Sequence, residues 1–137
     1  MTKILTVQQP WAWLIMHGGK NVENRSWRPA GGYRGELVIH AGKTIDDAGV
    51  ESAEADMRIE LPNPMPRGVI LGSVDLVDVV QDSDSEWAES GQWHWLLGTN
   101  LTILDKPMPW IGKLSLREFT ETWRMILEDH ASHDVFL

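Results

Sequence analysis

The chain has 137 residues, 42% of them hydrophobic and 23% charged, which is enough for one domain with a buried core. It contains no cysteine, so disulfides, thiolate nucleophiles and cysteine zinc sites are excluded, and no apolar run approaches the ~20 residues of a membrane span. The net charge of −8 argues against tight non-specific binding to a phosphate backbone. We therefore predict a single cytoplasmic domain, residues 1–137, that does not enter a membrane.

The charge is unevenly distributed along the chain. Residues 1–43 carry six basic and two acidic side chains, whereas the remaining 94 residues carry six basic and eighteen acidic ones. A locally basic site on an acidic body suits a small anionic or nucleotide-like ligand better than a long duplex. Eight tryptophans add large apolar faces that serve cores and base-stacking platforms alike.

The first forty residues are predicted to alternate short strands with one helix. Pro10 suits the first turn of a helix because it lacks an N–H that would have no partner there. Gly18 or Gly19 can take the left-handed conformation that ends such a helix. The predicted elements are a strand over 2–7, a helix over 10–17, and strands over about 21–26 and 35–41.

The remainder of the chain adds helices and strands in mixed order. Ser83 with Glu86, and Ser115 with Glu118, have the spacing of a capping box, which predicts a helix start at each place. The predicted elements are a helix over 44–58, a loop over 61–66, a strand over 68–80, a short helix ending before Gly91, strands over 92–97 and 100–105, a helix over about 115–129, and a loosely ordered tail over 130–137. This mixture predicts an α+β fold built on a small β-barrel.

The segment 18–27 concentrates polar chemistry between tryptophans. Lys20, Glu23 and Arg25 lie within six residues, directly before Trp27. Strand alternation would place Glu23 and Arg25 on one face and Lys20 on the other. A lysine near a carboxylate in a partly closed cleft can have its pKa lowered by desolvation and act as a base or nucleophile. The alternative is a surface ion pair without a function.

The same segment carries a resemblance to a known family. The sequence resembles the ASCH (activating signal cointegrator homology) domain over about residues 4–116, and this resemblance implies a PUA-like β-barrel flanked by helices, followed here by a C-terminal helix. The motifs that carry it are Gln9-Pro10-Trp11-Ala12, Gly18-Gly19-Lys20-Asn21-Val22-Glu23-Asn24-Arg25-Ser26-Trp27, Ile39-His40-Ala41, Gly72-Ser73-Val74-Asp75, Trp93-His94-Trp95, Pro107-Met108-Pro109 and Gly112-Lys113-Leu114.

The resemblance favours binding of single-stranded RNA or DNA, or of a modified nucleoside, in a basic cleft. Arg25 and Lys43 would contact phosphate, Trp27 would stack on a base, and Glu23 would bind a base edge. Trp93 and Trp95 share a strand face and are interpreted as core. The predicted ligand-binding residues are Lys20, Glu23, Arg25, Trp27, His40, Lys43 and Trp11, of which Trp11 also has core spacing.

Two other classes of function stay open. Some ASCH proteins are amidohydrolases acting on N4-acetylcytidine through a lysine and a threonine three residues later. Lys20 matches that lysine, but Glu23 stands at the threonine position, and Asp75 is the nearest acid to replace a distant glutamate. A ribonuclease-like reaction would use His40 with nearby cations. A third possibility is a protein-interaction module that forms a homodimer through the C-terminal helix. We expect no cofactor and no metal site.

Overall fold

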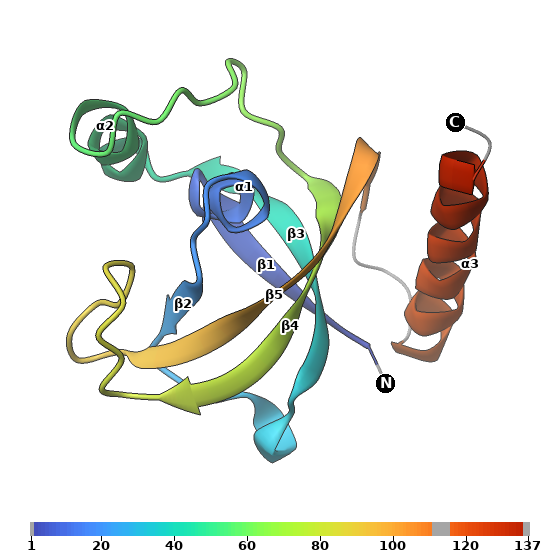
Figure 1. The fold of residues 1–137 in the computed structure, drawn as a ribbon, viewed down its shortest axis with the longest axis horizontal. Coiled ribbons are helices and arrows are strands. Elements are labelled where there is room, and N and C mark those ends of the chain that lie inside the picture. The colour runs from blue at the N-terminus through green and yellow to red at the C-terminus, as the bar shows by residue number, and fades with distance from the viewer. Residues whose placement is uncertain (1, 111–115, 136–137) are drawn as a thin grey trace.

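Five strands form one mixed sheet in the computed structural model, which describes residues 2–110 and 116–135. Its hydrogen-bonded order is β1-β3-β4-β5-β2, with β1 and β3 parallel and all other neighbours antiparallel (Figure 1). The elements are β1 (Lys3–Gln9), α1 (Trp11–His17), β2 (Val22–Arg25), the 3₁₀ turn η1 (Ala30–Gly32), β3 (Gly35–Ile45), α2 (Asp47–Ala55), β4 (Val69–Val80), β5 (Trp93–Pro109) and α3 (Leu116–Val135). The predicted α+β class with a C-terminal helix is confirmed.

The predicted closed barrel is not confirmed. β1 and β2 are the two ends of the hydrogen-bonded order, and among the described residues no ladder joins them. The sheet is nevertheless strongly curled (Figure 1). Register shifts between β3 and β4 and between β4 and β5 increase the local twist, as β-bulges do. The two edge strands therefore approach each other, and Arg25 Nη2 of β2 donates a hydrogen bond of 2.8 Å to the Thr6 carbonyl of β1.

Two hydrophobic clusters lie on opposite faces of the sheet. On the inner face, Ile15 and Met16 of α1 pack with Leu37 and Ile39 of β3. On the outer face, α3 packs Phe119 and Trp123 against Val38 and Ile70, among others. Figure 1 shows α1 and α3 on opposite sides of the sheet. The alternation of β3 side chains thus places successive residues in two layers, which explains why Leu37, Val38 and Ile39 are all buried.

Two predicted helices differ in the structure. The strand β3 runs on to Ile45, which pairs with Gln9, so α2 begins only at Asp47 and ends at Ala55. Its cap is Asp46, whose carboxylate accepts a hydrogen bond from the backbone N–H of Gly49. The predicted short helix after Ser83 is absent from residues 81–92 as the structure describes them, which form turns instead.

The later elements are longer than predicted. β5 is continuous over Trp93–Pro109, where we expected two strands, because it pairs with β4 along most of its length and with β2 at its start. α3 extends to Val135, past the predicted end at 129, so residues 130–135 are helical rather than a loose tail. Ser115 lies outside the described residues. None of the described helices combines the length and apolar character that crossing a bilayer requires.

Candidate functional site

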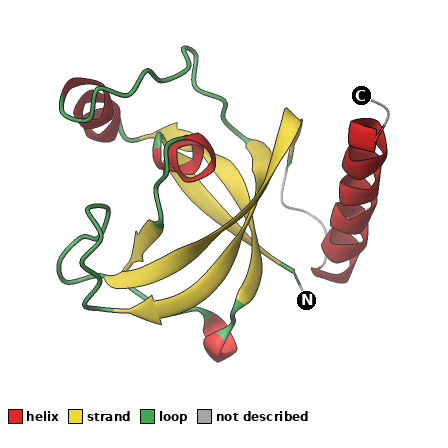
Figure 2. Ribbon diagram, viewed as in Figure 1, coloured by secondary structure: helices red, strands yellow, loops and turns green. Residues whose placement is uncertain are grey.

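A pocket of about 860 Å³ opens where the two edge strands of the sheet approach without pairing. Its walls come from β1, β2 and the residues that follow β2, and from Trp11, Asp46, Met57 and the turns at 86–92. These turns belong to the long loop between β4 and β5, which lies beside β2 (Figure 2). Five predicted ligand-binding residues line this pocket: Lys20, Glu23, Arg25, Trp27 and Trp11.

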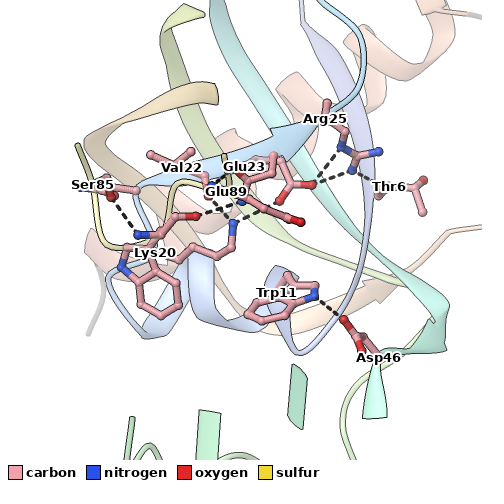
Figure 3. A network of polar contacts seen from close by, with 12 residues as sticks. Thr6, Trp11, Lys20, Val22, Glu23, Arg25, Asp46, Ser85 and Glu89 are labelled. Carbon is pink, nitrogen blue, oxygen red and sulfur yellow. Dashed lines mark hydrogen bonds and ion pairs between the residues drawn. The ribbon is translucent and has the colours of Figure 1, made fainter. Parts of the chain in front are cut away.

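Glu23 binds two cationic side chains at the centre of the pocket wall (Figure 3). Its Oε1 lies 3.2 Å from Lys20 Nζ, and its Oε2 accepts from Arg25 Nε at 2.9 Å and lies 2.8 Å from Arg25 Nη2. Lys20 and Glu23 are only 5% and 7% exposed. The strand faces predicted from alternation are corrected here, because Lys20 precedes β2 and its side chain turns back to Glu23.

A glycine turn makes this return of Lys20 possible. Gly19 has a φ of +74°, the left-handed conformation predicted for Gly18 or Gly19. The backbone N–H of Lys20 then bonds to the Leu14 carbonyl of α1 at 3.1 Å. Lys20 Nζ also donates to the Val22 carbonyl and lies 5.8 Å from the centre of the Trp11 ring. The lysine is therefore fixed on three sides.

Burial lowers the pKa of the Lys20 amine, against the opposing effect of the Glu23 carboxylate. Desolvation penalises the ammonium form, while the carboxylate 3.2 Å away favours it. Arg25 adds a further, smaller lowering of the pKa because it is a second cation near the same carboxylate. The amine is thus closer to deprotonation than a solvent-exposed lysine would be.

Trp11 is held in the pocket wall by the cap of α2. Its indole Nε1 donates to Asp46 Oδ2 at 3.1 Å (Figure 3). Oδ1 of the same carboxylate caps the helix. Gly49 allows this arrangement, since a Cβ there would lie 2.6 Å from Trp11 Cζ2. Sequence reasoning missed Asp46 as a site residue. Its helix-capping position was a usable signal, but the contact with Trp11 spans 35 residues.

Two exposed apolar side chains flank the pocket. Trp27 is 48% exposed and Met57 is 41% exposed, and both line it. Trp27 is held edge-on against Trp95, with ring centres 5.0 Å apart, and its carbonyl accepts a bond from Trp95 Nε1. The guanidinium of Arg25 lies 5.8 Å from the Trp27 ring centre. An oriented aromatic face is therefore presented to solvent at the pocket.

The loop between β4 and β5 is attached to β2 by Asn24. The amide Nδ2 of Asn24 donates to the Trp87 carbonyl at 2.9 Å, and its Oδ1 accepts from the Glu89 N–H at 2.8 Å. On the other side of the loop, His94 Nδ1 accepts from the Ser83 N–H, so its Nε2 carries the proton and donates to the Glu89 carbonyl. We had not predicted residues of this loop as site residues, because no local motif marks contacts this distant in sequence.

Three predicted site residues do not line the pocket. His40 is on the outer-face side of β3, where its Nδ1 is 3.0 Å from the Thr6 hydroxyl and burial lowers its pKa. Lys43 is exposed near the end of β3, and its carbonyl accepts a bond from Arg67. Asp75 lies on β4, 3.5 Å from the amide of Asn100. The structure does not bring these three residues together with Lys20 and Glu23.

The pocket is mixed in charge rather than basic. Two cationic and four acidic side chains line it, namely Lys20 and Arg25 against Glu23, Asp46, Glu86 and Glu89. The basic N-terminal segment predicted from the sequence is thus countered by acids from later in the chain. Among the described residues, no group of three or more His, Asp or Glu side chains is placed to hold a metal ion.

Comparisons with known proteins agree with the motifs. A family model of the ASCH domain matches residues 5–125, which extends the predicted resemblance into α3. Activating signal cointegrator 1 from Mus musculus and its counterpart from Homo sapiens are each 42% identical to this chain over 81 residues. The aligned part covers 54% of this chain but 14% of either relative. The chain is therefore similar to one short portion of much longer proteins.

Proposed function

The chain belongs to the ASCH domain family, as its motifs predicted, and from that premise we propose that its pocket binds a single nucleobase, presented by single-stranded RNA or DNA or as a nucleoside. The observation that carries this proposal is the exposed face of Trp27 beside a pocket of fixed donors and acceptors. A base has an apolar face and a polar edge, and this pocket offers a surface for each.

Stacking is the first contribution. Stacking of a base on an aromatic side chain contributes roughly 1–3 kcal/mol of binding free energy, whichever base it is. Trp27 needs no reorientation to receive a base, because two contacts with Trp95 fix its position. The rings meet edge-on, and Trp95 Nε1 donates a hydrogen bond to the Trp27 carbonyl. Met57 lies on the same pocket and adds a second apolar surface.

Hydrogen bonding to the base edge is the second contribution. Nη1 of Arg25 has no hydrogen-bond partner within the described part of the chain, so it can donate to a ligand while Nε and Nη2 hold Glu23. A carboxylate has about four lone-pair sites, so Glu23 retains acceptor capacity after binding both cations. Acidic side chains outnumber basic ones in the lining of this pocket. A largely uncharged nucleobase therefore fits it better than a phosphate group.

The test is binding of a fluorescently labelled RNA pentamer measured by anisotropy. We expect Trp27→Ala to weaken binding by about 5- to 150-fold, the equivalent of 1–3 kcal/mol of stacking. Trp27→Phe keeps an aromatic face and should bind within a few-fold of the wild type. Met125→Ala, at an exposed position on α3, is the matched control and should have no effect. Unchanged affinity in Trp27→Ala would rule the proposal out.

One observation favours a second candidate function, hydrolysis of an N4-acylated cytidine. The buried amine of Lys20 has a lowered pKa and lines the pocket. The neutral amine would take a proton from water as its oxygen attacks the acyl carbonyl. When the tetrahedral intermediate collapses, the ammonium would return that proton to the departing cytidine nitrogen, giving cytidine and the free acid. Glu23, rather than the remote Asp75, would position the amine.

This alternative makes its own prediction. Turnover of N4-acetylcytidine should rise with pH as the Lys20 amine deprotonates, and Lys20→Ala should abolish it. Lys20→Arg keeps the positive charge next to Glu23 but cannot act as a base, so it should also be inactive while remaining folded. Chromatography of the nucleoside products measures the rate. Full turnover in Lys20→Arg would exclude Lys20 as the base.

A further inference from the structure

A second pocket, of about 510 Å³, is lined mainly by residues that directly follow Trp27 in the chain. It is lined by Arg28, Pro29, Gly31, Gly32, Arg34 and Val79. In contrast to the first pocket, its lining contains two arginines and no acidic side chain. We propose that this pocket, here named the arginine pocket, binds a backbone phosphate of the single-stranded nucleic acid whose base occupies the first pocket. This inference rests on the proposed function.

The two arginines are oriented without using all their donors. The guanidinium of Arg28 lies 4.8 Å from the centre of the Trp93 ring, a contact that occupies its face and leaves its N–H edge free. Within the described residues Arg28 has no ion-pair partner. Nη1 of Arg34 donates to the Tyr33 carbonyl at 2.9 Å and lies 3.3 Å from the Gly32 carbonyl, which fixes the direction of its side chain.

Among the described residues, Asp78 is the one acid that an ion pair connects to this pocket. Its Oδ1 is 3.2 Å from Arg34 Nη2, and both side chains are solvent-exposed. The backbone N–H of Val79 and the bond from Arg34 lower the pKa of Asp78, so it is ionised at neutral pH. An exposed pair of this kind contributes little and is screened by salt. Arg28 therefore supplies the uncompensated charge, and Arg34 supplies directed donors.

The chain joins the two pockets at consecutive residues. Trp27 lines the first pocket and Arg28 lines the arginine pocket. Their partners on β5 are Trp95 and Trp93, two residues apart and hence on the same face of that strand. A nucleotide stacked on Trp27 would thus have its phosphate close to Arg28. Planar guanidinium groups match phosphate oxygens in pairs, as this arrangement requires.

The experiment compares charged and uncharged backbones. The probes are RNA pentamers, the same sequences with uncharged methylphosphonate linkages, and free nucleosides. The variants are Arg28→Gln and Arg34→Gln, with Arg124→Gln, an exposed arginine on α3, as the control for net charge. We expect each arginine-pocket variant to weaken binding of the phosphodiester pentamer by roughly threefold or more. Binding of the methylphosphonate pentamer and of the nucleosides should not change.

Salt dependence gives an independent measure. One neutralised phosphate of a single strand predicts a slope of log K against log salt of about −0.7, and each variant should reduce its magnitude. If Arg28→Gln and Arg34→Gln behave like Arg124→Gln, the arginine pocket is refuted while the base pocket stands, provided that Trp27→Ala still weakens binding. If the arginine variants weaken binding and Trp27→Ala does not, the phosphate site stands and the proposed base pocket fails. If the wild type binds no probe, both proposals fail.

Discussion

Lys20 is the residue whose chemistry depends most on its surroundings. The protein fixes its amine among Glu23, the Val22 carbonyl and the Trp11 ring. Because burial lowers its pKa below the ordinary value of 10.5, the folded protein binds fewer protons than the unfolded chain between the two pKa values. The free energy of unfolding should therefore rise with pH in that window, and Lys20 lowers stability at neutral pH.

We predict that the Lys20 amine titrates below the ordinary lysine pKa of 10.5. The measurement is the ¹³C chemical shift of each lysine Cε as a function of pH, with Lys20→Arg used to assign the signal. A further variant, Glu23→Gln, removes the carboxylate that favours the ammonium form, so it should lower the pKa of Lys20 further. A Lys20 signal that titrates at or above pH 10.5 would contradict this account of the site.

For individual residues, the sequence predicted which side chains lie close together but not which contacts they make. The run 18–27 marked Lys20, Glu23, Arg25 and Trp27, all of which line the first pocket. Their contacts depend on the turn at Gly19, which alternation along a strand does not describe. His40 and Lys43 were selected because of residue type near the end of a strand, and Asp75 as the nearest acid. Residue type does not determine which face or edge a side chain reaches. Whether any of these residues binds a ligand stays a prediction.

The loop between β4 and β5 depends on Asn24 for its attachment to β2. We predict that Asn24→Ala releases it, because two hydrogen bonds to loop backbone are lost at once. The free energy of unfolding should fall by about 1–3 kcal/mol, and the amide of Glu89 should exchange with solvent faster. Urea denaturation and amide hydrogen exchange measure the two effects. Asn24→Asp keeps the acceptor for Glu89 and should be intermediate.

The control for this prediction is Asn100→Ala. The Asn100 amide makes one long contact of 3.5 Å to Asp75 on an exposed part of the sheet. Its removal should leave both the stability and the exchange at Glu89 unchanged. Equal exchange at Glu89 in Asn24→Ala and the wild type would mean that other contacts, such as that of His94, are sufficient to hold the loop.

Element prediction failed where a local signal competed with a distant partner. The spacing of Ser83 and Glu86 indicates a helix, but the Ser83 backbone and the segment up to Glu89 bond to His94 and Asn24 instead. Two strands were predicted over 92–97 and 100–105, yet pairing with β4 keeps β5 continuous. Helix α1 was predicted at nearly its observed bounds because its start and stop signals are local.

The molecule combines a net charge of −8 with two pockets that differ in the charge of their lining. The order β1-β3-β4-β5-β2 places the second strand of the chain at one end of the sheet and the first at the other. Composition could not reveal this order, because pairing between distant strands is set by tertiary contacts. The open gap between β1 and β2, which contains the first pocket, follows directly from it. The pocket is not the basic cleft expected from the N-terminal segment, because acidic side chains from distant parts of the chain also line it.

The packing of the C-terminal helix α3 determines which oligomeric state we predict. A homodimer through this helix was one of the possibilities that the sequence left open. In the structure Phe119 and Trp123 of α3 are 2% and 1% exposed, packed on the sheet of the same chain. Trp123 Nε1 also donates to the Glu36 carboxylate at 3.1 Å. A dimer through this face would have to displace the helix, so we now predict a monomer of 15.5 kDa.

Light scattering coupled to size-exclusion chromatography tests this prediction. The wild type should have the monomer mass, and Trp123→Ala should lose about 3–5 kcal/mol of stability and self-associate, because the apolar surface around Val38 and Ile70 becomes accessible. Trp123→Phe keeps most of the packing and loses only the bond to Glu36, so it should remain monomeric and lose about 1 kcal/mol. Met125→Ala changes a side chain that is 68% exposed and should alter nothing if the monomer is correct. A wild-type dimer that Met125→Ala dissociates would overturn this prediction, because the outer side of α3 would then be the interface.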